Sequence, residues 1–161
     1  MGKVTTFLWF DSQAEDAARF YTEIFPNSRL KRSGAYTESV EAAVGKPAGS
    51  VLTVEFELDG SDFIAMNGGP GHPFTDAISL SVDCKDQAEV NYYWERLTAD
   101  GGKEVACGWL TDKYGVSWQV VPEILPRLIT DSDRAKADRA LAAMMKMTKI
   151  IIADIEKAAE G

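Results

Sequence analysis

The chain has 161 residues, 45% of them hydrophobic and 10% aromatic, which is enough for one sizeable core or for two small sheet modules that share one. Its formal net charge of -8 argues against a general nucleic-acid binder, because neutralising phosphates requires a basic face. No segment approaches the roughly 18 consecutive apolar residues of a membrane span, so we expect a cytoplasmic protein that does not contact a membrane.

Apolar periodicity and turn residues predict the elements of the first half. In chain order these are a strand over residues 4–10, a helix over 14–25, a strand over 29–36, a polar loop of weak structure over 37–49, and strands over 51–58 and 62–66. Asp59-Gly60 is the strongest two-residue hairpin signal in the chain. The glycine-rich stretch 67–73 lacks the lysine of a phosphate loop, and we expect a turn-rich crossover there.

The second half begins as a copy of the first. At an offset of 72 residues Asp11 meets Asp83, and the aromatic pair at 20–21 meets the pair at 92–93. Each half is therefore predicted to run strand, helix and then further strands.

The repeat also predicts which way each strand faces. The residues beneath the two helices are expected to be Thr6, Leu8 and Phe10 in the first copy and Ile78, Leu80 and Val82 in the second. Thr5, Phe7, Trp9, Ser79 and Gln119 would then share a concave surface. An alternative stays open, in which Phe7 and Trp9 fill a closed sheet interior.

A tryptophan-rich hairpin over residues 105–122 ends the second copy. Its turn spans residues 111–115, and alternation on the second arm places Trp118 in the core and Gln119 on the opposite face. We interpret Asp112 and Tyr114 as turn-capping and packing residues rather than acid–base groups, because an aspartate at a turn commonly accepts bonds from its own backbone.

The remaining residues predict a helical tail. A short helix over 123–129 precedes a longer one, for which Asp131-Ser132-Asp133 offers an N-cap and which continues to Met147. The predicted apolar stripe of this tail comprises Leu141, Met144, Met145, Thr148 and Ile152. We expect the apolar segment Ile150-Ile151-Ile152 to pack on a neighbouring subunit or across a cavity mouth, which predicts a homodimer.

Several motifs resemble the glyoxalase and bleomycin-resistance superfamily, also called vicinal oxygen chelate. The opening motifs are Phe7-Leu8-Trp9-Phe10-Asp11, Glu15-Asp16-Ala17-Ala18-Arg19-Phe20-Tyr21 and Phe25-Pro26-Asn27-Ser28. Leu58-Asp59-Gly60, Asn67-Gly68-Gly69-Pro70, Cys107-Gly108-Trp109-Leu110, Asp112-Lys113-Tyr114-Gly115 and Ser117-Trp118-Gln119 are similar to its PhnB-like branch, which carries a demethylubiquinone methyltransferase-like label. The resemblance covers essentially residues 3–125.

The resemblance implies an α+β fold of two paired βαβββ modules that form a curved mixed sheet around a concave cavity. The modules would span about 3–68 and 76–122 within a domain of residues 1–125, and residues 126–161 would form a C-terminal helical extension. Enzymes of the superfamily coordinate a divalent metal with His, Gln or Glu from four positions. The matching places here hold Thr5 or Thr6, Ala77, a residue near Met66 or Asn67, and Gln119, of which only Gln119 could ligate.

Other metal sites are limited by composition. His72 is the only histidine, which excludes a site built on two histidines of one chain. Cys84 and Cys107 are too few for a disulfide framework or a paired-cysteine metal site, and we expect reduced thiols. No glycine-rich strand-to-helix turn of a methyltransferase domain is found, so methyl transfer is the least favoured function.

We therefore predict a metal-free and cofactor-free protein that binds or sequesters a small molecule, with no catalytic residue assigned. The expected ligand-binding residues are Thr5, Phe7, Trp9, Asn67, Ser79, Trp109 and Gln119. The expected partners are the ligand and a second copy of the chain, with no nucleic acid and no membrane. The alternative is a superfamily enzyme of lyase, isomerase or dioxygenase type.

Overall fold

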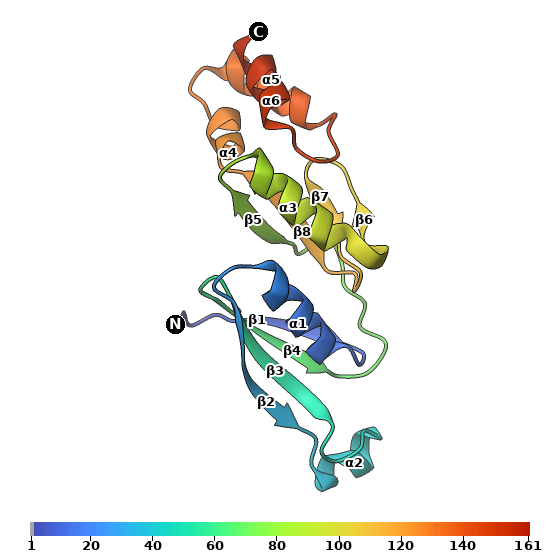
Figure 1. Ribbon diagram of the computed structural model, residues 1–161. Coiled ribbons are helices and arrows are strands. Elements are labelled where there is room, and N and C mark those ends of the chain that lie inside the picture. Colours follow the sequence, from blue (N-terminus) through green and yellow to red (C-terminus); the bar gives the residue numbers. More distant parts are fainter. Residues whose placement is uncertain (1) are drawn as a thin grey trace. The chain divides into compact units, whose positions relative to one another are not determined.

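The computed structural model describes residues 2–161 (Figure 1). The chain forms two compact units, one ending at Pro73 and one running from Phe74 to Gly161, and each is described by itself. The helical extension belongs to the second unit. None of the helices among residues 2–161 is long and apolar enough to cross a membrane.

The first unit is a βαβββ module with one added helix. Its elements are β1 (Thr6–Phe10), α1 (Ala14–Ile24), β2 (Arg29–Ala35), α2 (Glu38–Val44), β3 (Val51–Leu58) and β4 (Ser61–Asn67). The strands form one sheet in the order β1-β4-β3-β2, in which β1 and β4 are parallel and the other neighbours antiparallel. The Asp59-Gly60 turn joins β3 to β4 as predicted.

Helix α1 covers one face of this sheet because its inner side is built from small residues and two larger anchors. Ala14, Ala17 and Ala18 are fully buried, and alanines allow the helix backbone to approach the strands closely. The Tyr21 ring stacks on Phe56 of β3 at a centroid distance of 6.2 Å. Aromatic contacts of this kind add to the free energy gained from area burial.

Helix α2 differs from the prediction, which placed a loop of weak structure over residues 37–49. The segment Glu38–Val44 is helical, and Gly45 ends it in the left-handed conformation with a φ of 72°. None of the helix residues is buried. The prediction failed because a short helix without a buried face shows no amphipathic period.

The second unit repeats the module and adds the tail. Its module consists of β5 (Leu80–Cys84), α3 (Gln87–Thr98), a 3₁₀ turn (Ala99–Gly101), β6 (Lys103–Glu104), β7 (Trp109–Thr111) and β8 (Ser117–Pro122). The sheet order β5-β8-β7-β6, with β5 and β8 parallel, matches the order of the first sheet. The α+β fold of two paired βαβββ modules is confirmed; the shared concave cavity stays a prediction.

The repeat is confirmed, but its offset of 72 is wrong. The first strands begin at Thr6 and Leu80, which is an offset of 74, and Ile78 lies outside β5 and is 75% exposed rather than packed under α3. The predicted burial of Leu8 and Phe10 in the first copy and of Val82 in the second is correct. Offsets of 72 and 74 are both even, so side chains keep the same face of the strand under either alignment.

The tail folds on its own unit. It contains α4 (Ile124–Ile129), α5 (Arg134–Met144) and α6 (Ile152–Glu160). Ile150 is fully buried in a cluster with Leu125, Leu128, Ala140, Ile155 and Ala159. The expectation that the isoleucine segment packs on another subunit or over a cavity is therefore wrong for Ile150, and the homodimer stays a prediction without that support.

The predicted apolar stripe of the tail is only partly correct, because Met144 packs against this cluster but other members of the stripe are exposed. Leu141 and Met145 are 42% and 62% exposed, whereas Ala137 and Ala140 form the buried side of α5. Small residues bury completely where helices pack closely, and hydrophobicity alone does not reveal them. The helix ends at Met144, three residues before the predicted end.

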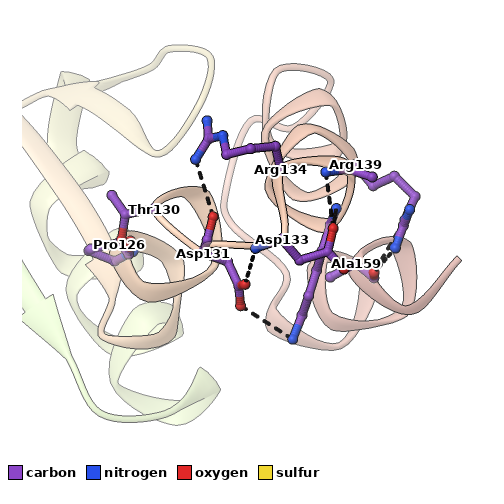
Figure 2. Close-up of polar contacts among 9 residues, drawn as sticks. Pro126, Thr130, Asp131, Asp133, Arg134, Arg139 and Ala159 are labelled. Atoms are coloured by element: carbon purple, nitrogen blue, oxygen red, sulfur yellow. Dashed lines mark hydrogen bonds and ion pairs between the residues drawn. The ribbon is translucent and has the colours of Figure 1, made fainter.

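Polar contacts fix the ends of the tail helices (Figure 2). The Asp133 carboxylate accepts from the backbone N–H groups of Ala135 and Lys136 and caps α5, as predicted. The Arg139 guanidinium donates to the carbonyl oxygens of Ala158 and Ala159, and Figure 2 shows it beside the last turn of α6. A cation at a helix C-terminus is favourable because the last carbonyls carry partial negative charge.

Candidate functional site

The open face of the first sheet, defined as the face turned away from α1, carries Phe7 and Trp9. Phe7 is 52% exposed and Trp9 is half-buried. The Trp9 indole N–H donates to the carbonyl of Gly69 at 2.9 Å, and its ring lies 4.3 Å from the His72 ring between centroids. A Cβ on Gly68 would lie 2.2 Å from the indole, so this glycine is required where the loop crosses the ring.

Asn67 forms hydrogen bonds to several elements of the first module. Its side-chain oxygen accepts from the Ala14 N–H at 2.8 Å at the start of α1, and its side-chain nitrogen donates to the Val51 carbonyl at 3.1 Å. The Tyr36 hydroxyl donates to the Asn67 backbone carbonyl. Its predicted ligand role stays a prediction, and these contacts commit its side chain to joining α1, β3 and β4.

A cavity of about 250 Å³ lies on the open face near Thr5, which immediately precedes β1. Its other lining residues include Lys31, Arg32, Glu55, Asp62 and Ile64. Sequence reasoning placed Thr5 near the site and missed the charged residues around it. The available signal was the alternation of β3, which places Glu55 and Glu57 opposite the buried Val54 and Phe56.

Ion pairs cross three strands of this face. The Lys31 ammonium lies 2.5 Å from Asp62 Oδ1 and 3.1 Å from Glu57 Oε2, and Arg32 lies 2.7 Å from Glu55. The hydrogen bond from Lys31 lowers the pKa of the Asp62 carboxyl from its ordinary value. The bonds to Asp62 and Glu57 in turn raise the Lys31 pKa.

The second unit brings its three predicted site residues together. Gln119 of β8 donates through Nε2 to the Ser79 hydroxyl at 2.9 Å, and Trp109 of β7 is the cross-strand partner of Gln119. All three side chains are half-buried. Trp118 and Val120, the neighbours of Gln119 in sequence, are buried on the α3 side as the alternation predicts.

The hairpin turn beside this group is a structural element. The Asp112 carboxylate accepts from the backbone N–H groups of Tyr114 and Val116 at 2.9 and 3.1 Å. It also accepts from the Trp118 indole N–H at 2.9 Å, and Asp112 is only 3% exposed. These bonds agree with the interpretation of Asp112 as a turn-capping residue.

The chain is similar to known proteins over most of its length. Residues 2–121 match the family described as 3-demethylubiquinone-9 3-methyltransferase. A structure described as a putative 3-demethylubiquinone-9 3-methyltransferase, PhnB protein, from Bacillus cereus is 34% identical, with a TM-score of 0.65 over 75% of this chain and 99% of that one. The chain therefore belongs to this PhnB-like family of the glyoxalase, or vicinal oxygen chelate, superfamily.

More distant structures share the fold alone. Protein PA1353 from Pseudomonas aeruginosa is 18% identical, with a TM-score of 0.60 over 76% of this chain and 98% of that chain. The fosfomycin resistance protein FosX from Listeria monocytogenes, complexed with Mn(II) and sulfate, is 17% identical, with a TM-score of 0.52 over 84% of this chain and 95% of that chain. No curated protein sequence matches significantly.

The divalent metal typical of the superfamily does not fit the donor set of this chain. Thr5 offers a neutral hydroxyl, Ala77 offers no side-chain donor atom, and Gln119 is hydrogen-bonded to Ser79. Within residues 2–161, no three His, Cys, Asp or Glu side chains are grouped to hold an ion. Hard cations require several oxygen ligands, mostly anionic, which these positions do not supply.

Proposed function

We propose that this protein binds or sequesters a small molecule without using a metal. The observation that carries the proposal is the group of Gln119, Ser79 and Trp109, in which an amide and a hydroxyl lie beside a half-buried indole. Such a group has no strong metal ligand and no acid or base. Its chemistry suits recognition of a flat molecule by stacking and hydrogen bonding.

The first sheet supplies similar groups. Phe7 and Trp9 expose aromatic surface on its open face, and Thr5 adds a hydroxyl near the cavity. Aromatic walls with a few polar groups are typical of small-molecule sites. The expected ligand is therefore small, with a flat or apolar body and at least one hydrogen-bonding group.

The family description names methyl transfer, and the proposal does not include that activity. Each four-stranded sheet of the described chain has only one pair of parallel neighbouring strands. The usual methyltransferase domain is instead a doubly wound, mostly parallel sheet. The first strand-to-helix connection, residues 11–13, contains no glycine. These features lower the support for a cofactor-dependent methyl transfer.

The proposal is tested by screening aromatic and apolar metabolites for thermal stabilisation of protein purified without chelators. For a compound that binds, Gln119→Leu and Trp109→Ala should each weaken binding at least about tenfold, because each removes a direct contact. Tyr92→Ala is the matched control, since Tyr92 is an exposed aromatic residue on α3. Elemental analysis and titration after EDTA treatment should show no stoichiometric metal and an unchanged Kd.

Two outcomes would contradict the proposal. One is binding that disappears with EDTA and returns with a divalent ion, since this would require a metal ligand set. The other is a screen that yields no stabilising compound, or only compounds whose binding is unaffected by Gln119→Leu and Trp109→Ala.

A further inference from the structure

The cavity on the open face of the first sheet is small and carries paired charges. Its volume of about 250 Å³ lies just below the ~300 Å³ at which pockets for drug-sized ligands begin, so its occupant is of metabolite size. The side chains of Lys31, Asp62 and Glu55 are only 25%, 20% and 30% exposed. Charges covered to this extent are less screened by solvent than those on an open surface.

The signs of these charges restrict the ligand. The charged lining consists of two cations, Lys31 and Arg32, and two carboxylates, Glu55 and Asp62, joined as Lys31–Asp62 and Arg32–Glu55. An anionic ligand that displaced Asp62 from Lys31, or Glu55 from Arg32, would leave a carboxylate side chain that is only 20% or 30% exposed without its partner, which is unfavourable. A cationic ligand would leave Lys31 paired with Glu57, or leave the 80% exposed Arg32 in solvent, but it would gain no contact with either cation. A ligand with both signs can replace each displaced partner and leave none unpaired.

Apolar surface lies next to the charges. Ile64 lines the cavity, and Phe7 is its cross-strand neighbour on β1, with 52% of its surface exposed. Side chains in adjacent strands on one face lie close enough to form a continuous surface. An apolar group attached to the charged part of a ligand would cover Phe7 and Ile64.

The fold does not require charges at these positions. Strand register shows that Asp62 of β4 corresponds to Ser117 of β8, because each immediately precedes the residue that pairs with the first residue of the parallel strand. Glu55 of β3 corresponds to Trp109 of β7, because their partners, Ile64 and Gln119, occupy the same place in β4 and β8. The second sheet thus has neutral residues at the two places where the first sheet has these carboxylates. The strand pairing that both sheets share therefore does not require Glu55 and Asp62.

We propose that this cavity binds a small zwitterion with an apolar body, of which a hydrophobic α-amino acid is the simplest example. The ligand's ammonium group is placed at the Asp62 and Glu55 carboxylates, and its carboxylate at the Lys31 and Arg32 cations. Its apolar body covers Ile64 and Phe7. This inference goes beyond the proposed function, because the cavity belongs to the first unit and the Gln119 group to the second, so that each can hold or fail separately.

The test compares three probes that share a phenyl ring and differ in charge. Calorimetric titration at pH 7 would use L-phenylalanine, the anion 3-phenylpropanoate and the cation 2-phenylethylamine. The zwitterion should bind at least about tenfold more tightly than either singly charged probe, because only it pairs with the carboxylates and the cations together. Amide chemical shifts should change on β2, β3 and β4.

Variants should change the charge preference in opposite directions. Lys31→Met should shift the preference toward 2-phenylethylamine, and Asp62→Asn should shift it toward 3-phenylpropanoate. Arg19→Met is the matched control, because it also removes a cation from an ion pair, that of Arg19 and Glu15 on α1. Asp62→Asn keeps the test decisive if Lys31→Met does not fold.

Failure of this inference is distinguishable from failure of the proposed function. The inference is overturned if L-phenylalanine binds no more tightly than the singly charged probes, or if Lys31→Met and Asp62→Asn leave the preference as in Arg19→Met. Binding of a neutral aromatic compound that responds to Gln119→Leu would then leave the proposed function standing. A metal requirement for every ligand would overturn the proposed function instead.

Discussion

The hydrogen bond between Asp112 and Trp118 is predicted to be a main source of stability in the second unit. Asp112 is 3% exposed and Trp118 is 2% exposed, and the indole N–H donates to Asp112 Oδ2 at 2.9 Å. Asp112→Asn keeps the side-chain size and removes the negative charge. Trp118→Phe removes the indole donor.

The burial and the geometry of this bond determine the size that we expect for both changes. A hydrogen bond to a charged group contributes about 1.5–3 kcal/mol, and a buried group left without its partner costs about 1–3 kcal/mol. We therefore expect Asp112→Asn to lower the free energy of unfolding by about 2–3 kcal/mol. Trp118→Phe should cost at least as much, because it also leaves a space in the core.

The two changes should not be additive, because they remove the same bond. The double variant is expected to be more stable than the sum of the single effects predicts, by at least about 1 kcal/mol. Urea denaturation followed by far-UV circular dichroism measures this without depending on tryptophan fluorescence. Asp100→Asn is the control, since the Asp100 side chain is 80% exposed, and its effect should stay within about 0.5 kcal/mol.

Additive effects within about 0.5 kcal/mol would refute the reasoning, since independent sites add to that accuracy. An Asp112→Asn variant with an unchanged free energy of unfolding would also refute the reasoning. If the protein proves to be an enzyme, an Asp112→Asn variant that loses activity but keeps its stability would show that Asp112 acts in the reaction and not only in the fold.

Three further predictions follow from individual contacts. Lys31 lowers the pKa of Asp62, so the stabilisation from this pair is present above the ordinary carboxyl pKa of about 3.9 and is lost as pH falls through the lower, folded-state value. Urea denaturation from pH 7 to 2 should show this loss, and Asp62→Asn should reduce it; an unchanged pH dependence in that variant would argue against it. Burial raises the pKa of Cys84 to about 12, so a thiol reagent such as DTNB should label only the half-buried Cys107 in native protein and both cysteines after unfolding. Rapid labelling of both thiols in the native state would contradict this. Asn67→Leu should cost about 1–3 kcal/mol of unfolding free energy, because it leaves two backbone groups unpaired, and an unchanged denaturation midpoint would show that these bonds contribute nothing.

Part of the candidate site could be predicted from local patterns. Alternation on β8 correctly separated Gln119 from the buried Trp118, and the repeat correctly placed Ser79 near Gln119. The charged cavity was missed because Lys31, Glu55 and Asp62 belong to three strands and are distant in sequence. Their pairing depends on strand register, including an irregularity between Leu30 and Ser33 of β2.

The sequence by itself determined that each half runs strand, helix and further strands, which face of the first strands is buried, and the turn at Asp59-Gly60; the βαβββ pairing of the modules was implied by the family resemblance. These features depend on periodicity and on turn residues, which act over a few positions. Only the tertiary structure showed that Asn67 joins α1 to β3 and that Ile150 is buried within its own unit. It also revealed the alternating charges that meet at Lys31. Contacts of this kind join residues far apart in the chain, and their partners are defined only when register and helix packing bring them together.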